Sequence, residues 1–321
     1  MTAEPSAAER ALRAVLIPET DYRVVPVPGR PGYRIGRSSD GGVVLLTPPD
    51  PAPKANTRLE RLGLMPSIGC RVTDDDGHVE QITAGVVAYR PGDDDLVPHF
   101  VRVAEALAEL LGPDPAPGEV SRQMSRLVRL FEPTRGSRGS ELGLWGELLT
   151  IASSPDPAQM LASWHVRVDD RFDFAAEGTR LEVKTTAGAD RIHRFRLHQL
   201  EPVPGAATYV VSITTSTAEA GTTVADLVDR VTAQLGGQPA AVLGLQAQVS
   251  ATLGPEWAAR PQTAYDESQA VASTRLLDAT AVPRVAPAPP AVLSVELTVD
   301  CSDVPSTDSG GVAGLARLVR R

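Results

Sequence analysis

The stretch DRFDFAAEGTRLEVKTT, residues 170–186, decides how the middle of this 321-residue chain folds. Apolar and charged residues alternate through DRFDFA and again through RLEVKTT, which is the period-two pattern of half-buried strands. Glu177 and Gly178 lie between the two runs, and glycine accepts the positive φ that a tight turn needs. The sequence therefore predicts a β-hairpin centred on Glu177-Gly178.

The position of the turn sets the register of this hairpin, because residues equally far from it lie opposite each other. Asp173 then faces Glu182, and Arg171 faces Lys184, on a charged face. The other face is apolar and is expected to cover a core; it holds Phe172, Phe174, Leu181 and Val183. The hairpin thus brings two carboxylates and a lysine to one side.

Two carboxylates opposed at about 4.5–5.5 Å destabilise a hairpin unless a positive charge lies between them. Mg²⁺ is a suitable cation, since proteins hold it through one or two carboxylates, water and substrate phosphate. Lys184 follows Glu182 by two residues and is one of only two lysines, with Lys54, among 31 basic residues. Its compact charge suits a group that orients or deprotonates a water. The alternative from the same residues is a surface hairpin with an Arg171–Glu182–Lys184 ion network.

Composition and length indicate a folded chain of more than one module. The hydrophobic fraction of 42% and charged fraction of 22% are near the globular norm. Cys70 and Cys301 are far apart and do not form a zinc or disulfide pattern. The polar N-terminus and the lack of a long apolar run predict a cytoplasmic protein with no membrane partner. Neither GxGxxG nor GxxxxGK[ST] occurs, which disfavours a dinucleotide-binding or P-loop enzyme.

Breaks in the pattern divide the chain into three expected modules. Residues 1–115 read as a β-rich α+β module, 118–216 as an α/β core, and 217–321 as a helical and β module. Within the core, residues 140–153 predict a helix with Ser140 as its N-cap. RFRLHQL, residues 194–200, predicts a short helix, and TYVVSITT, residues 208–215, a buried strand.

The motifs GLWGELL at Gly143, DRFDF at Asp170, LEVKTT at Leu181 and HRFRLHQL at His193 occur in this order. Together they resemble the bacterial PD-(D/E)XK motif proteins, a branch of the PD-(D/E)XK nuclease superfamily. The resemblance covers about residues 139–215 and extends loosely over the chain. It implies a restriction-endonuclease-like αβββαβ core within a mixed α/β fold, with N-terminal β-rich and C-terminal α/β additions. Phe172 stands where the proline of the motif's name would be.

The resemblance also implies roles for single residues. Asp173 and Glu182 match the two metal-binding acids, Lys184 the catalytic lysine, and Glu147 the acid of the first core helix, all serving a Mg²⁺ that Mn²⁺ could replace. Gln199 resembles a polar residue near such sites. We expect nucleic-acid contacts without sequence reading from the polar residues of the same stretch. These residues are Arg171, Arg180, Thr185, Arg191, His193, Arg194 and Gln199.

The expected function is that of a Mg²⁺-dependent DNA endonuclease in a bacterial restriction or anti-phage defence system. The expected partners are DNA and proteins of that system, and a homodimer is left open. The net charge of −9 counts against strong DNA binding, although residues 121–200 hold 12 basic against 10 acidic residues. The alternative is therefore a non-catalytic or partner-activated subunit that docks on DNA or protein. An enzyme acting on RNA fits these residues equally well.

Overall fold

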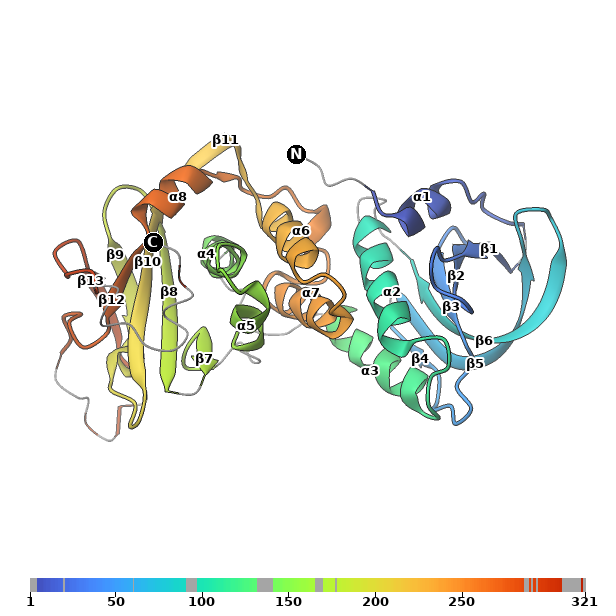
Figure 1. Cartoon of the computed structure of the whole chain (residues 1–321), viewed down its shortest axis with the longest axis horizontal. Helices are drawn as coiled ribbons and strands as arrows, with labels where there is room; N and C mark the ends of the chain where they lie inside the picture. Colours follow the sequence, from blue (N-terminus) through green and yellow to red (C-terminus); the bar gives the residue numbers. More distant parts are fainter. Residues whose placement is uncertain are drawn as a thin grey trace. The chain divides into compact units, whose positions relative to one another are not determined.

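The computed structural model describes residues 5–19, 21–59, 61–90, 97–131, 141–164, 170–176, 178–285, 289, 291–292, 294–307 and 319. These residues form eight α-helices and several β-sheets, a mixed α/β fold as expected (Figure 1). They divide into two compact units. The first comprises Thr2–Gly136 and Gly237–Arg260, and the second comprises Ser137–Gly236 and Pro261–Arg321. This grouping is coarser than the three expected modules, whose boundaries stay a prediction.

The first unit is built on a six-stranded sheet in the order β1-β2-β3-β6-β5-β4. The strands are β1 (Tyr22–Pro26), β2 (Arg34–Ser38), β3 (Val43–Thr47), β4 (Thr57–Arg58), β5 (Leu62–Thr73) and β6 (Val79–Tyr89). Its helices are α1 (Ala7–Arg13), α2 (Val97–Leu111), α3 (Glu119–Phe131) and α7 (Pro239–Leu253), with a 3-10 turn, η3 (Trp257–Ala259).

Alternating residues of this sheet face two separate cores. One face packs Ile35, Leu45 and Val87 against α1, α2 and α3, where the Phe100 ring stacks on Tyr89 with centroids 5.1 Å apart. The other face buries a second apolar cluster that includes Val44. The sheet is thus apolar on both sides, and helices cover one of them.

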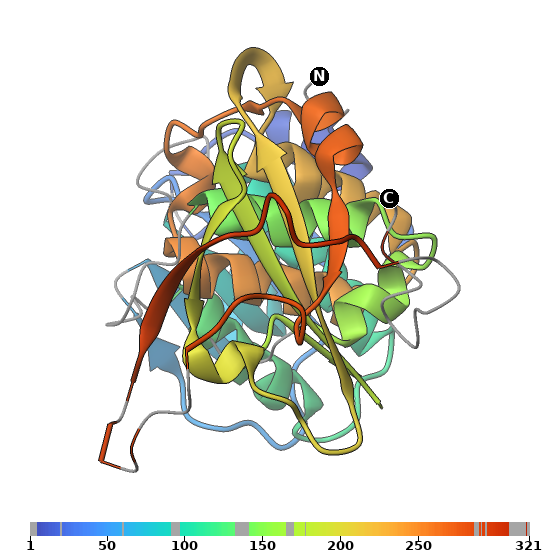
Figure 2. The ribbon, with the colours of Figure 1, turned by 90° about the vertical axis from the view of Figure 1, so that its left-hand side faces the viewer.

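The second unit contains a four-stranded sheet in the order β12-β10-β8-β7. Its strands are β7 (Phe174–Ala176), β8 (Thr179–Ala187), β10 (Ala207–Thr215) and β12 (Arg275–Asp278). β8 and β10 run parallel and side by side (Figure 2), and the other two pairings are antiparallel. α4 (Glu141–Ala152) packs on one face, and the ribbon of β9 (Ile192–Arg196) and β13 (Glu296–Asp300) lies on the other (Figure 1).

The remaining elements of the second unit surround this sheet. They are α5 (Pro157–Ala162), η2 (Leu197–Leu200), β11 (Thr217–Thr222), α6 (Val224–Gln234) and α8 (Glu267–Ser273). A core that includes Phe195, Val210 and Leu277 lies between the sheet and the β9–β13 ribbon. Among the described helices, none combines the length and the apolar character that crossing a membrane requires.

The expected helix over RFRLHQL is wrong in its first half. Residues 194–196 belong to β9, in which His193 and Phe195 are buried while Ile192, Arg194 and Arg196 are exposed. This alternation buries Phe195 opposite Leu297 of β13, so a strand satisfies both the apolar contacts and the backbone hydrogen bonds. The helical part is the single 3-10 turn η2.

The chain order α4, α5, β7, β8, β9, η2, β10 contains the expected element types in the expected order, with α5 as an additional helix and a 3-10 turn in place of the second core helix. β9, however, pairs with β13 in a sheet of its own. Assignment of this unit to the restriction-endonuclease-like core therefore stays a prediction.

Candidate active site

The hairpin of β7 and β8 has the register expected from its turn. Phe174 pairs with Leu181, Ala175 with Arg180, and Gly178 has a positive φ of 69°. Glu177 and the proposed helix cap Ser140 lie outside the described residues. The first strand is shorter than expected, because it begins at Phe174.

Asp173 therefore joins the hairpin through its side chain. Its Oδ2 accepts a hydrogen bond from the backbone N–H of Val183 at 2.7 Å, in place of the expected backbone pairing with Glu182. Arg171 does not face Lys184 as expected; its guanidinium donates to the carbonyl of Glu201 at 2.7 Å. The hairpin still delivers the Asp173 carboxyl group to the side of β8 where Glu182 lies, close enough for the two charges to interact.

Glu182 and Lys184 alternate with buried apolar residues of β8 and so share one face of the strand. Lys184 Nζ lies 2.6 Å from Glu182 Oε1; the Glu182 side chain is 2% exposed and that of Lys184 is 20% exposed. The ammonium also lies 5.3 Å from the centroid of the Phe195 ring, within the range of a cation–π contact. Lys184 is thus half-buried and held against an acid.

Gln199, on η2, connects the end of β9 to this pair. Its Nε2 donates to Glu182 Oε1 at 2.6 Å, while its Oε1 accepts from the backbone N–H of Arg196 at 2.9 Å and lies 3.5 Å from Lys184 Nζ. This orientation of the Gln199 amide is consistent, because its NH₂ group faces an acceptor and its oxygen faces N–H donors. Gln199 therefore orients Glu182 from a segment 17 residues further along the chain.

Glu147 approaches from helix α4. Its Oε2 accepts a hydrogen bond from the indole Nε1 of Trp164 at 2.7 Å, and its charge acts on Asp173. Trp164 follows α5 and makes an isolated bridge with Phe174 of β7. The sequence analysis did not identify Trp164, because no motif links a tryptophan to an acid 17 residues away.

The helix can come this close to the strand because of Gly146. A Cβ at this position would lie 1.8 Å from Thr185 Oγ1 of β8, a separation at which one of the two groups must shift. The Oγ1 of Thr185 is buried under the helix without a hydrogen-bond partner among the described residues. Thr185 is thus placed as a packing residue of the α4–β8 contact.

The electrostatics of the acids fit a divalent cation. Burial raises the pKa of Asp173 well above its usual value, and the charges of Glu182 and Glu147 raise it further, while Lys184 and the Val183 N–H act in the opposite sense. Carboxyl groups of this kind supply the hard oxygen ligands that Mg²⁺ and Mn²⁺ take. Asp173 and Glu182 would hold the ion, with Glu147 beside them.

Among the residues proposed to contact nucleic acid, most guanidinium groups are engaged within the protein. Arg180 donates to the carbonyls of Ala176 and Thr179, and Arg191 to the carbonyl and hydroxyl of Ser212. Arg194 is exposed on β9.

His193 is 3% exposed and shares a hydrogen bond with Ser212 Oγ at 2.7 Å. Burial, with the charges of Lys184 and Arg191, lowers its pKa to about 4. The ring is therefore neutral at pH 7 and points into the protein.

A second group of metal-type ligands lies elsewhere, at the turn between β5 and β6 of the first unit. Ligand atoms of Asp74, Asp76 and His78 all lie within 4.8 Å of one another, a spacing that no other such group of three reaches in the described part of the chain. The turn is exposed, and His78 Nδ1 is 3.5 Å from Asp74. Exposed acidic turns are common without any ion.

Comparison with known proteins identifies the family. Residues 13–302 match the family described as "Putative PD-(D/E)XK family member" (DUF4420), and the chain belongs to it. No curated protein matches the chain, and no solved structure does. The resemblance expected from the hairpin motifs is thus confirmed over most of the chain.

Proposed function

We propose that this chain is a metal-dependent nuclease that hydrolyses phosphodiester bonds of DNA. The observation that carries the proposal is the meeting of Asp173, Glu182 and Lys184 on one side of β8. Glu147, anchored by Trp164, adds a third acid to the same place. The family to which the chain belongs supports this assignment.

Each residue has a distinct task in the proposed reaction. Mg²⁺ or Mn²⁺, when bound, would polarise the scissile phosphate and lower the pKa of an attacking water. Asp173 and Glu182 would hold the ion through their carboxylates. As an ammonium, Lys184 would leave Glu182 to orient the water, and its charge would stabilise the negative charge of the transition state. To accept the proton of the water instead, Lys184 would first have to release its own proton to solvent.

Gln199 and Trp164 act through the acids. Gln199 keeps Glu182 Oε1 directed toward Lys184, and Trp164 keeps Glu147 directed toward Asp173. Both are positioning residues, because each donates one hydrogen bond to a carboxylate that would otherwise rotate.

Substrate binding requires cations outside this cluster. Arg194 is exposed on β9 and suits a phosphate contact. The net charge of −9 makes the chain a weak DNA binder alone, so we propose that proteins of a restriction or defence system, or a second copy of the chain, supply further affinity. The same observation favours a second candidate, a subunit that docks on DNA or protein without cutting.

The test is cleavage of supercoiled plasmid with Mg²⁺ or Mn²⁺, comparing wild type with Glu182→Gln and Lys184→Ala. Glu182→Gln keeps the shape of the side chain and removes its charge, so the fold is retained. Glu219→Gln, an exposed acid on β11, is the matched control. We expect nicking or linearisation by wild type and control, and losses of at least about a hundredfold in both site variants.

Two outcomes decide between the candidates. If folded wild type and Glu182→Gln are equally inactive, the docking subunit replaces the nuclease as the better assignment. If Lys184→Ala cleaves like wild type, the role given to Lys184 is wrong.

A further inference from the structure

The sheet of the first unit curls into a barrel with one open side. β5 pairs with β6 along its length, and its end also pairs in parallel with β1, Tyr22 with Val72 and Arg23 with Thr73. Near its start, β5 pairs instead with the two-residue strand β4. Between these two pairings, a bulge between Met65 and Ile68 bends β5.

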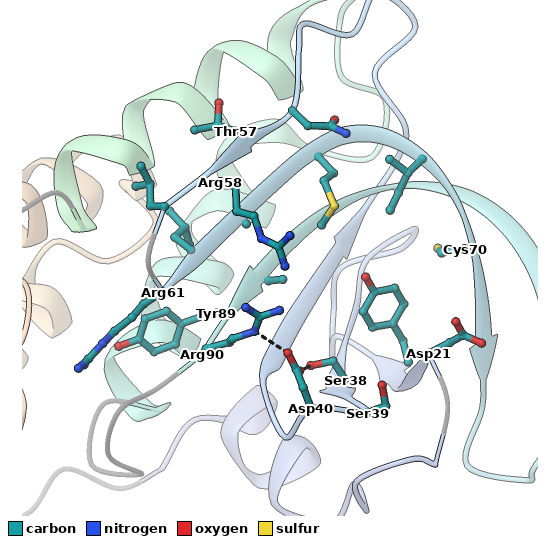
Figure 3. A pocket seen from close by; sticks show the side chains of 18 of the residues that line it. Asp21, Ser38, Ser39, Asp40, Thr57, Arg58, Arg61, Cys70, Tyr89 and Arg90 are labelled. Carbon is teal, nitrogen blue, oxygen red and sulfur yellow. Dashed lines mark hydrogen bonds and ion pairs between the residues drawn. The ribbon is translucent and has the colours of Figure 1, made fainter.

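A cavity of about 580 Å³ opens at this side of the barrel (Figure 3). Its floor is apolar: Tyr22, Met65, Ile68 and Ala88 are partly buried and pack on the second core of the unit. The rim is polar and comes from the ends of β2, β4 and β6. It includes Ser38, Ser39, Asp40, Asn56, Arg58 and Arg90. A cavity of this volume in the mouth of a barrel, with an apolar floor and few polar groups, is typical of a small-molecule site.

The acids of the rim are already neutralised. Asp21 accepts from Arg71 Nε at 2.7 Å, and Asp40 accepts from Arg90 Nε at 2.5 Å and from the hydroxyl of Ser38 at 2.5 Å. Each carboxylate thus has a cation within hydrogen-bonding distance. The rim therefore does not repel an anion as strongly as its composition suggests.

Arg58 stands apart from this network. It is exposed, and it makes neither a hydrogen bond nor an ion pair through its side chain within the described residues. Figure 3 shows its guanidinium directed toward the same space as that of Arg90, above the floor of the cavity. Asp40 balances the charge of Arg90, so the two guanidinium groups together keep one unbalanced positive charge, which an anion in the cavity would neutralise.

We propose that this cavity binds a nucleotide. The phosphate would lie between Arg58 and Arg90, and the flat base would lie on Met65 and Ile68, since apolar side chains accept the face of any base. Asn56 lies at the rim, where it offers its amide group to the base edge. The choice of a nucleotide over other anions rests on the proposed function, which makes nucleic acid the substrate of the chain.

The volume agrees with this ligand, because sites of about 300–1,000 Å³ take ligands of this size. A nucleotide unit could enter either as a free monophosphate or as an extruded unit of a nucleic-acid strand. Both sources present the same base and phosphate to the cavity.

The test is binding of the four deoxynucleoside 5′-monophosphates to the full chain by calorimetry, without metal. Deoxyribose 5-phosphate, which lacks the base, and the nucleosides, which lack the phosphate, serve as the two halves of the ligand. We expect saturable binding of at least one monophosphate and at least tenfold weaker binding of either half. Arg58→Ala should weaken the monophosphate at least about tenfold, and Arg58→Lys less. Arg13→Ala, an exposed arginine of α1 outside the cavity, should bind as wild type does.

The proposal is overturned if no monophosphate binds below about 10 mM, or if Arg58→Ala binds like wild type. Glu182→Gln should bind nucleotide normally, so a failure here is separate from a failure of the nuclease proposal.

Competition against a labelled duplex with one mismatched pair identifies the source. If the monophosphate displaces the duplex from wild type but not from Arg58→Ala, the cavity takes an extruded unit of a strand. If the monophosphate binds without displacing the duplex, the cavity takes a free nucleotide.

Discussion

The Lys184 side chain is the clearest case of a residue whose surroundings match its chemistry. An arginine could make the same ion pair with Glu182, and this chain uses arginine for nearly all its basic residues. A guanidinium cannot give up its proton, whereas lysine carries a compact ammonium that is able to do so. The ammonium of Lys184 also lies 5.3 Å from the centroid of the Phe195 ring, a contact fitted to the length of a lysine. We therefore expect Lys184→Arg to retain the fold and to lose most cleavage, with the plasmid assay as the measurement.

Asp173 is expected to limit the stability of the metal-free protein. Its buried carboxyl group lies near Glu182 and Glu147, so Asp173→Asn removes a repelling charge while the amide oxygen still accepts from Val183. The variant should raise the melting temperature without metal by about 2 °C or more. Added Mg²⁺ should raise it for wild type and much less for the variant, as scanning calorimetry would show.

The pH dependence of this difference has a definite sign. The raised pKa of Asp173 means that the folded protein loses stability as the pH rises through that pKa. The difference in melting temperature between Asp173→Asn and wild type should therefore shrink on acidification, because protonation of Asp173 in the wild type removes the same charge. A variant that melts lower than wild type at pH 7 would contradict this account.

At the level of elements, helix α4 and strand β8 depend on a close approach at Gly146. Gly146→Ala places a methyl group 1.8 Å from Thr185 Oγ1 and 3.0 Å from Thr185 Cβ, so the helix, the strand or the Thr185 side chain must shift. We expect a loss of about 1–3 kcal/mol in the free energy of unfolding, and reduced cleavage because Glu147 moves with the helix. Denaturant unfolding measures the first effect.

A double-mutant cycle with Thr185→Ala tests this cause directly. Removing Thr185 Oγ1 leaves the Cβ of residue 185 at 3.0 Å from the new methyl group. The double variant should regain part of the lost stability. If the two losses simply add, the clash is not the reason for the destabilisation.

The start of helix α3 depends on Asp50, which is 2% exposed. It accepts hydrogen bonds from the N–H groups of Ala52, Gly118 and Ser121 and from the Ser121 hydroxyl. Burial acts to raise the pKa of Asp50, but the bonds from Ser121, Ala52 and Gly118 outweigh it and hold the pKa at about 2. An ionised side chain thus caps the helix from a loop nearly 70 residues earlier.

Because this pKa is lowered, Asp50 stabilises the fold above pH 4 and loses that effect as the pH falls toward 2. Asp50→Asn should lower the free energy of unfolding by about 2 kcal/mol at pH 7 and by progressively less below pH 4. Urea unfolding at several pH values measures this, with the exposed Asp114→Asn as control. A cost that does not change with pH would show that charge is not what the helix end requires.

For the whole molecule, the balance of charge sets how DNA can be bound. The chain carries a net charge of −9, and Arg171, Arg180 and Arg191 donate to groups of the protein. Of the four arginines expected to contact nucleic acid, this leaves Arg194, which is exposed. We expect a plot of the logarithm of the DNA affinity against the logarithm of the salt concentration to have a slope of about −2 for wild type. For Arg194→Ala the slope should be about −1. Fluorescence anisotropy measures the slope, and a value steeper than about −5 would contradict the expectation.

Local patterns in the chain were sufficient for the hairpin, its register and the helix that precedes it. The turn and the alternation around Gly178 specify which residues of β7 and β8 pair, because all of this information lies within 17 residues. Helix α4 spans Glu141–Ala152, within the helix expected over residues 140–153. The grouping of Asp173, Glu182 and Lys184 follows from the same short stretch.

Contacts between distant segments could not be read in this way. β9 became a strand because β13, about 100 residues later, offers it backbone partners and an apolar face. Trp164 reaches Glu147, and Gln199 reaches Glu182, only once α4, β7 and η2 pack on one sheet. The cavity above Met65 exists because β5 returns to β1. Periodicity shows which face of a segment is buried but not what buries it. The acids and the lysine were therefore evident in the chain, Gln199 was indicated by the family resemblance alone, and Trp164 was not indicated at all.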